Sequence, residues 1–463
     1  MEMPWLSWRV GLIPHNDPDN EGDGMARKEV MTSEEEGLPP GWTRGQRRTG
    51  LLLLCLVGIV NLLDRQAISM VLEPIKHEFH VTDTQLGLLT GATFALVYAT
   101  LAIPMARLVD TGARKTIFAL CIGVWGLGTM LAGVATSFAV LLTSRVGVAA
   151  GESASMPATH SMAADLYPRR MLPMALGLMT ASNSMGVALS LFLGGWLSEA
   201  FGWRVMFIVI GIPAVLLAFA LQFGMRDPPR RTAHGDVVAA VKAPLREVLG
   251  YLGSLRSYLA VVVGLSAGGF SGFAMLGWGP SFLIRVHGLA PREVGFWFGL
   301  AAAAGLGVGA LVSGKLCAVL GQRNVAWYLR LGGAALSICV PVGLMVAFSH
   351  NAIVAVTGFF LYTFFSSMQA PACYSMIQSL ARPGMRGTAI AACALINTLV
   401  GSGLGPFIMG VLNDHFGVTH GAEGIRYSMA CVMIGAAIAC CSYLFGSRFA
   451  QAEYARVDLP RPT

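Results

Sequence analysis

Residues 51–71 read LLLLCLVGIVNLLDRQAISMV, an apolar run that contains the charged pair Asp64-Arg65. A run of about 20 apolar residues is long enough to cross a bilayer as a helix. Ionisable side chains at bilayer depth are unfavourable, and they usually face a bundle interior or a water-filled cavity. A second apolar segment holds another such pair, Arg145 and Glu152. The two segments therefore predict an integral membrane protein with a charged interior.

The composition of the whole chain favours the same interpretation. Hydrophobic residues make up 55% of the 463 positions and charged residues only 12%, whereas an ordinary soluble protein has about 25% charged residues. We predict an all-α membrane protein with twelve transmembrane helices at residues 50–73, 85–108, 114–136, 138–165, 171–198, 203–224, 257–284, 292–319, 325–348, 351–381, 386–413 and 424–447. The nine Cys show no metal-binding spacing, so we expect no metal and no cofactor.

The basic residues predict the orientation of the chain in the membrane. If the N-terminus is cytoplasmic, five of the 32 Lys and Arg residues lie outside and two lie within spans, which leaves 25 on the cytoplasmic side. This asymmetry follows the positive-inside rule. We therefore expect a protein of the inner (plasma) membrane with both termini in the cytoplasm. Because the basic residues are divided among short loops, the net charge of +7 does not indicate nucleic-acid binding.

The chain divides into two halves of six spans each. A basic segment without a span, residues 225–256, separates an N-terminal bundle at 46–224 from a C-terminal bundle at 257–447. Residues 1–45 are polar and predict a disordered cytoplasmic tail, and residues 448–463 predict a second cytoplasmic tail.

The two halves also repeat each other in sequence. A shift of 215 residues places Gly186 over Gly401 and LSEAFG at 197–202 over LNDHFG at 412–417. Internal repeats of this kind are typical of secondary transporters, with the substrate site between the halves. Channels can also be duplicated, so the repeat favours a transporter without excluding a pore.

These features resemble the major facilitator superfamily along nearly the whole chain after residue 45. Between spans two and three, this family carries the motif G-x-L-x-D-R-x-G-R-[RK], and residues 106–115 read ARLVDTGARK. Asp110, Arg114 and Lys115 match its acid and its two final bases. The resemblance implies the major facilitator fold of two pseudo-symmetric bundles, a monomer, and a cytoplasmic gate in which these three residues latch the halves. A solvated loop turn is the alternative for the same residues.

Two further motifs resemble those of bacterial Spinster-like lipid transporters. Residues 61–65, NLLDR, are similar to the N-x-x-D-R of that group. Residues 144–152, SRVGVAAGE, are similar to its S-R-x5-G-E block. Both motifs lie in the N-terminal half, so the resemblance implies a subfamily and says little about the substrate.

Helix geometry gives the depth of the charges in these motifs. With a rise of 1.5 Å per residue, Asp64 lies about 20 Å above the cytoplasmic end of its span, and Arg145 reaches a similar height on span four. We therefore expect a contact between Asp64 and Arg145. Glu152 follows Arg145 by two helical turns on the same face, which predicts an acid–base–acid ladder.

An acid in such a site can change its protonation as a cavity opens and closes, because water or an arginine favours its ionised form and desolvation favours its neutral form. Our hypothesis is that Asp64 and Glu152 couple transport to protons. Arg65 and Arg145 would compensate these acids and could bind an anionic head group such as a phosphate. The alternative is a static ion-pair network that holds spans one and four together.

The C-terminal half differs, because its spans carry large apolar side chains and almost no charge. The candidates for an apolar cavity wall are Phe270, Phe273, Trp278, Phe360, Phe364 and Met368. Gln369, Asn397 and Ser402 could add hydrogen bonds. A charged wall opposite an apolar wall would suit an amphiphile with its head on one side and its tail on the other.

We therefore predict a proton-coupled secondary transporter that works by alternating access on a small amphiphile, of lysophospholipid or sphingoid type. A transporter of small organic anions or drugs is the alternative, and a channel is the rival from another class. The chain has no HExxH zinc motif and no GxxxxGK[ST] nucleotide loop, so neither an enzyme nor an ATP-driven pump is favoured. Glu73, which precedes Pro74 at the outer end of span one, is expected to be solvated.

Overall fold

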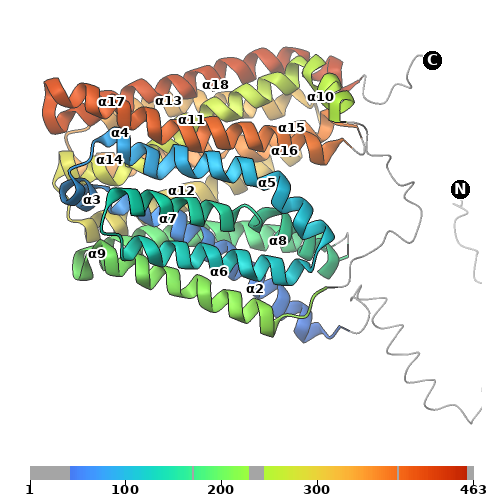
Figure 1. The fold of residues 1–463 in the computed structure, drawn as a ribbon. Helices are drawn as coiled ribbons and strands as arrows, with labels where there is room; N and C mark the ends of the chain where they lie inside the picture. Colours follow the sequence, from blue (N-terminus) through green and yellow to red (C-terminus); the bar gives the residue numbers. More distant parts are fainter. Residues whose placement is uncertain (1–41, 169–170, 229–244, 383–384, 456–463) are drawn as a thin grey trace, which may run out of the picture.

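The computed structural model describes residues 42–168, 171–228, 245–382 and 385–455, and these ranges form helices joined by short turns (Figure 1). The N-terminal half contains α2 (Arg44–Ala67), η1 (Ile68–Met70), α3 (Leu72–Phe79), α4 (Asp83–Gly87), η2 (Leu88–Ala92), α5 (Thr93–Thr111), α6 (Arg114–Gly133), α7 (Phe138–Glu152), α8 (Ser155–Leu166) and α9 (Leu172–Gly224). The C-terminal half contains α10 (Leu245–Ser254), α11 (Arg256–His287), α12 (Pro291–Leu320), α13 (Ala326–Ala347), α14 (Ala352–Ser367), α15 (Gln369–Leu380), α16 (Arg386–Asn397), η3 (Thr398–Leu404), α17 (Gly405–His420), η4 (Gly421–Glu423) and α18 (Gly424–Tyr454).

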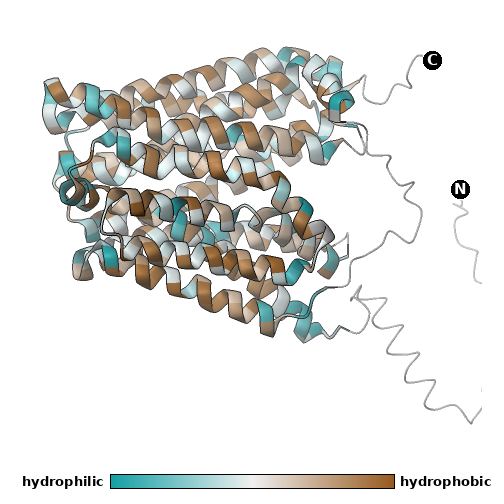
Figure 2. Ribbon diagram, viewed as in Figure 1, coloured by the Kyte–Doolittle hydropathy of each residue, from teal (hydrophilic) through white to brown (hydrophobic). Residues whose placement is uncertain are grey.

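The helices have the length and hydropathy of membrane spans. Within the described ranges, nine helical segments are long enough and apolar enough to cross a bilayer. Figure 2 shows apolar residues along the middle of the bundle and hydrophilic residues concentrated at its two ends. Inside a bilayer, water cannot form hydrogen bonds with the backbone. A helix suits this environment because it satisfies its backbone hydrogen bonds internally. The predicted all-α membrane fold is confirmed.

Two of the nine segments contain a reversal of the chain at a glycine with positive φ. Within α9, Gly202 has a φ of 83°, a conformation that glycine adopts without steric penalty. Before Gly202 the helix packs along α2, and after it Lys115 of α6 donates to the carbonyl of Gln222. Gly421, with a φ of 57°, reverses the chain between α17 and α18. These reversals agree with the predicted twelve spans, a number that stays a prediction.

The sequence repeat corresponds to equivalent contacts between the halves. Gly195 of α9 lies against the carbonyl of Pro291 at the start of α12, and Gly410 of α17 lies against the carbonyl of Asp83 at the start of α4. A side chain on either glycine would collide with that carbonyl, so small residues let helices from opposite halves approach closely. The two glycines are 215 residues apart, which is the shift that relates the halves in sequence.

The bundle has two distinct ends. Figure 1 shows α3 and α4 at the left, which we name the α3 end, whereas α2 begins and α18 ends at the right, which we name the terminal end. The predicted C-terminal tail starts at residue 448, but α18 continues to Tyr454. Its Glu453 accepts hydrogen bonds from the backbone amides of Arg256 (2.8 Å) and Ser257 (3.0 Å), which fixes the end of α18 on the start of α11.

The segment predicted to link the halves is partly helical, because α10 lies within it. The remainder of that linker at 229–244, the N-terminal tail up to residue 41 and residues 456–463 lie outside the described residues.

Candidate transport site

Asp64 and Arg145 form the buried ion pair that the sequence predicts. Arg145 Nη1 of α7 lies 4.0 Å from Asp64 Oδ2 of α2, and the two side chains are 3% and 1% exposed. Trp125 and Thr129 of α6 lie beside the carboxylate, and the guanidinium lies 5.1 Å from the ring centre of Phe207. At 4.0 Å the pair is loose, and neither Asp64 oxygen accepts a hydrogen bond from a described residue. A buried charge with so few partners is unfavourable unless its protonation or its partners change.

Glu152 lies at the other end of α7, and the predicted acid–base–acid ladder stays a prediction. Its side chain is 1% exposed, and the cation that acts on it most strongly is Arg65, ahead of Arg145, with Asn61 also beside it. The residue lines a cavity of about 250 Å³ that Tyr98 also lines. The described polar groups around this cavity come from the N-terminal half. The site therefore has two buried acids, Asp64 and Glu152, near two arginines.

Arg65 connects this cavity to the C-terminal half. Its Nη2 donates a hydrogen bond of 3.3 Å to Ser402 Oγ of η3, and its guanidinium lies 4.4 Å from the ring centre of Phe94. Arg65 also lines a small cavity of about 30 Å³ together with Phe273 and Ser402. Arg65 therefore lines both cavities and contacts the C-terminal half.

A third cavity, of about 210 Å³, lies within the C-terminal half. Its walls combine apolar side chains and glycines with a few hydroxyl and amide groups, namely those of Leu265, Gly268, Gly269, Gly272, Phe273, Leu276, Leu306, Tyr362, Thr363, Ser366, Ser367, Gln369, Ala370 and Asn397. Gln369 and Asn397, which are predicted from the sequence to form hydrogen bonds with the substrate, both line this cavity. This wall is therefore more polar than the sequence indicates.

The six candidates for an apolar wall have different positions. Phe273 lines the cavities of about 210 and 30 Å³. Trp278 is fully buried, and its Nε1 donates a hydrogen bond of 2.9 Å to the carbonyl of Pro406, so it packs α11 against α17. Phe270 packs on α18 at Gly435. The other three lie on α14 and at its end: the rings of Phe360 and Phe364 are 6.3 Å apart, and the carbonyl of Met368 accepts a hydrogen bond from Ser313.

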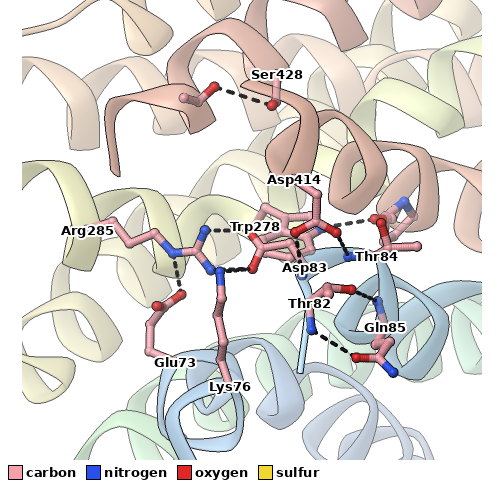
Figure 3. Close-up of polar contacts among 12 residues, drawn as sticks. Glu73, Lys76, Thr82, Asp83, Thr84, Gln85, Trp278, Arg285, Asp414 and Ser428 are labelled. Atoms are coloured by element: carbon pink, nitrogen blue, oxygen red, sulfur yellow. Dashed lines mark hydrogen bonds and ion pairs between the residues drawn. The ribbon is translucent and has the colours of Figure 1, made fainter. Parts of the chain in front are cut away.

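Charged residues join the two halves at the α3 end (Figure 3). Arg285 of α11 lies between two acids of the N-terminal half, at 2.7 Å from Glu73 Oε1 and 2.5 Å from Asp83 Oδ2. Lys76 also binds Asp83, at 2.5 Å. The expectation that Glu73 is solvated is wrong, because its side chain is only 13% exposed and is paired across the interface. Outside the spans, the hydrogen bond from Arg204 lowers the pKa of Glu78.

The residues predicted to form a cytoplasmic gate make their described contacts with the N-terminal half and with Asp227 and Pro228 at the start of the linker. Arg114 lies 2.5 Å from Asp165 of α8, and Lys115 donates a hydrogen bond of 2.7 Å to the carbonyl of Gln222 in α9. Both contacts connect α6 to helices of the N-terminal half. The side chain of Asp110 lies outside the described residues. The latch between halves stays a prediction.

A bundle of two matched halves with buried charges on interior cavities is the architecture of secondary transporters. A family profile described as "Major Facilitator Superfamily" matches residues 54–406, and the chain belongs to this superfamily of membrane transporters.

Its relatives include transporters of several kinds. An "MFS-type efflux pump" of Mycolicibacterium smegmatis is 33% identical over 407 residues, which are 86% of this chain and 92% of that protein. A "probable L-galactonate transporter" of Escherichia coli is 25% identical over 69% of this chain and 71% of that protein. A crystal structure of a bacterial homologue of the human lysosomal transporter Spinster, in an inward-facing and unoccupied conformation, has a TM-score of 0.82 and 27% identity over 91% of this chain and 100% of that chain.

Proposed function

We propose that this transporter couples the movement of protons to that of a small amphiphile, of lysophospholipid or sphingoid type, by alternating access. The observation that carries the proposal is the pair of buried acids, Asp64 and Glu152, each beside an arginine. In a rigid structural network such acids would be fully hydrogen-bonded. Here Thr129 and Trp125 lie beside Asp64 and Asn61 lies beside Glu152, but both Asp64 oxygens and Glu152 Oε1 lack a hydrogen bond of good geometry to a described residue.

The proton-coupling role follows from what changes around these acids during transport. When the halves rock, the distance from an acid to its arginine and to water changes, and both changes move the balance between the ionised and neutral forms. Asp64 would carry the main coupled proton. Glu152, on the wall of the cavity of about 250 Å³, would be an accessory site.

The arginines support an anionic head group. Arg65 lines two cavities, and a guanidinium binds phosphate or carboxylate through two parallel hydrogen bonds. The similarity of NLLDR at 61–65 and SRVGVAAGE at 144–152 to motifs of Spinster-like lipid transporters supports an amphiphile. The relative named as a galactonate transporter favours a small organic anion, which is the second candidate.

The proposal includes an orientation in the inner membrane with both termini in the cytoplasm. The described chain begins and ends at the terminal end of the bundle (Figure 1). The five basic residues expected outside are Lys76, Arg204, Arg285, Arg292 and Arg426. In this orientation the α3 end, where Arg285 joins the halves, faces away from the cytoplasm.

Uptake into proteoliposomes under an imposed pH gradient tests the proposal. Labelled lysophosphatidate and labelled gluconate are offered to the purified full-length protein, with a protonophore as the control that removes the gradient. We expect gradient-stimulated uptake of lysophosphatidate. Stimulated uptake of gluconate alone would favour a transporter of small organic anions. Uptake that does not depend on the pH gradient would contradict proton coupling.

A further inference from the structure

Three glycines of α11 form one wall of the cavity of about 210 Å³, and a polar side chain from another helix lies over each of them. Gln369 of α15 lies over Gly268, Asn397 of α16 lies over Gly269, and Ser366 of α14 lies over Gly272. A Cβ atom at Gly268 or Gly269 would collide with the amide oxygen above it. The glycines therefore make room for two carboxamides inside a largely apolar cavity.

The hydrogen bonds of Gln369 fix the direction of its amide. Cys373 Sγ donates to the hydroxyl of Tyr443 at 3.1 Å, and this hydroxyl donates to Gln369 Oε1, also at 3.1 Å. The amide oxygen is thus occupied on the side of α18. The side chain is 6% exposed, and its Nε2 group donates to no described residue. An amide nitrogen has two protons to donate, and these are left for the cavity.

Asn397 and Ser366 also have polar side-chain atoms without a described hydrogen-bond partner. The Asn397 Oδ1 atom is buried and accepts no hydrogen bond from a described residue, and Ser366 has no described hydrogen bond. By contrast, Thr363 and Ser367 on the same wall donate to carbonyls of their own helix. Buried polar groups are normally satisfied, and a pocket with a few convergent polar groups among apolar ones is typical of a ligand site.

We infer that these three groups bind oxygen atoms of the substrate that lie close to its anionic group. The inference rests on the proposed function and names the part of the substrate that the C-terminal half recognises. Phe273 lines both this cavity and the small cavity beside Arg65 and Ser402, so these polar groups and Arg65 are neighbours. The substrate is then an oxygenated anion, with hydroxyl or ester oxygens next to a phosphate or carboxylate.

Two sources supply this chemistry, and matched ligand pairs distinguish them. One pair is lysophosphatidate against an alkyl phosphate of equal chain length, and the other is gluconate against hexanoate. Equilibrium binding to the purified full-length protein is measured for all four compounds. A site built to hydrogen-bond an oxygen rejects the analogue that lacks it. We expect the wild type to bind the oxygenated member of one pair about tenfold more tightly or better.

Asn397→Leu keeps the number and branching of the side-chain heavy atoms and removes the amide. We expect it to lose most of that preference while the bare member of the pair binds as before. Because Asn397 Oδ1 has no described partner, the melting temperature should stay unchanged or rise, which separates a binding role from a structural one. Gln369→Leu is the second variant. Ser375→Ala on α15 is the matched control, since its hydroxyl donates only to the carbonyl of Pro371.

The outcomes separate this inference from the proposed function. Equal binding of both members of each pair by the wild type, or an undiminished preference in Asn397→Leu, would overturn the inference. Gradient-driven uptake of an anion would still support the proposed function in that case. If the wild type binds none of the four compounds, both the inference and the proposed substrate class fail.

Discussion

Glu199 and Asp414 hold equivalent positions in the two halves, and each caps a helix of the opposite half. Glu199 Oε2 accepts a hydrogen bond of 2.8 Å from the backbone amide of Arg292, at the start of α12. The two oxygens of Asp414 accept hydrogen bonds of 2.9 and 2.8 Å from the amides of Asp83 and Thr84, at the start of α4. Helix N-termini favour negative charge. The repeat thus places one clamp in each half, and both close the α3 end.

Asp414→Ala should open the α3 end more than Glu199→Ala does, because it removes two hydrogen bonds instead of one. A hydrogen bond to a charged group contributes about 1.5–3 kcal/mol. Spin-label distances across the α3 end measure the open population. Glu293→Ala is the control, since its carboxylate accepts from Ala290 within the same half. The reverse order of effects, or equal effects in all three variants, would contradict the clamp.

Arg285→Ala should destabilise the closed α3 end by about 2–5 kcal/mol, because it leaves Glu73 unpaired and Asp83 with Lys76 alone. Arg285→Lys should recover only part of this loss, since an ammonium lacks the planar fork that reaches two acids. Thermal unfolding and the same spin-label distances measure both effects. A lysine variant that behaves like the wild type would show that only the charge matters.

Arg145→Ala should lower the free energy of unfolding by about 3–5 kcal/mol, because it leaves the carboxylate of Asp64 buried without its partner. Adding Asp64→Asn to this variant should restore much of the loss. A double-mutant cycle of thermal unfolding measures the coupling between the two side chains. If the two single losses simply add, the 4.0 Å pair does not interact energetically.

Trp278→Ala should destabilise the protein by about 3–5 kcal/mol with little change in substrate preference, because the ring is fully buried between α11 and α17. Phe273→Ala should change the substrate preference with little loss of stability, because this ring lines two cavities. Melting temperature and substrate competition, measured side by side, separate the two roles. A large change of preference in Trp278→Ala would place that ring at the substrate.

The fold and the Asp64–Arg145 contact could be predicted because both follow from one-dimensional rules. Hydropathy gives the spans, and a fixed rise per residue gives the depth of a charge within them. The glycines and acids that repeat 215 residues apart predicted that the two halves are equivalent. Gly195 and Gly410, for example, make equivalent contacts with the opposite half.

The contacts between loops and between halves could not be predicted in this way. Glu73 meets Arg285, which is 212 positions away in the chain, and no local pattern relates them. The sequence also could not predict which apolar side chains line a cavity. Phe273 and Trp278 are five residues apart on one helix, and only the rotation and packing of that helix decide which of them lines a cavity.

The most direct test of the account is transport by Asp64→Asn under two driving forces. The variant keeps the shape of the side chain and cannot release a proton. Uptake driven by a pH gradient requires the coupled proton, whereas counterflow exchange of labelled for unlabelled substrate does not. We predict that gradient-driven uptake is lost and that counterflow persists. Full gradient-driven uptake in Asp64→Asn would contradict the central role of Asp64 in proton coupling.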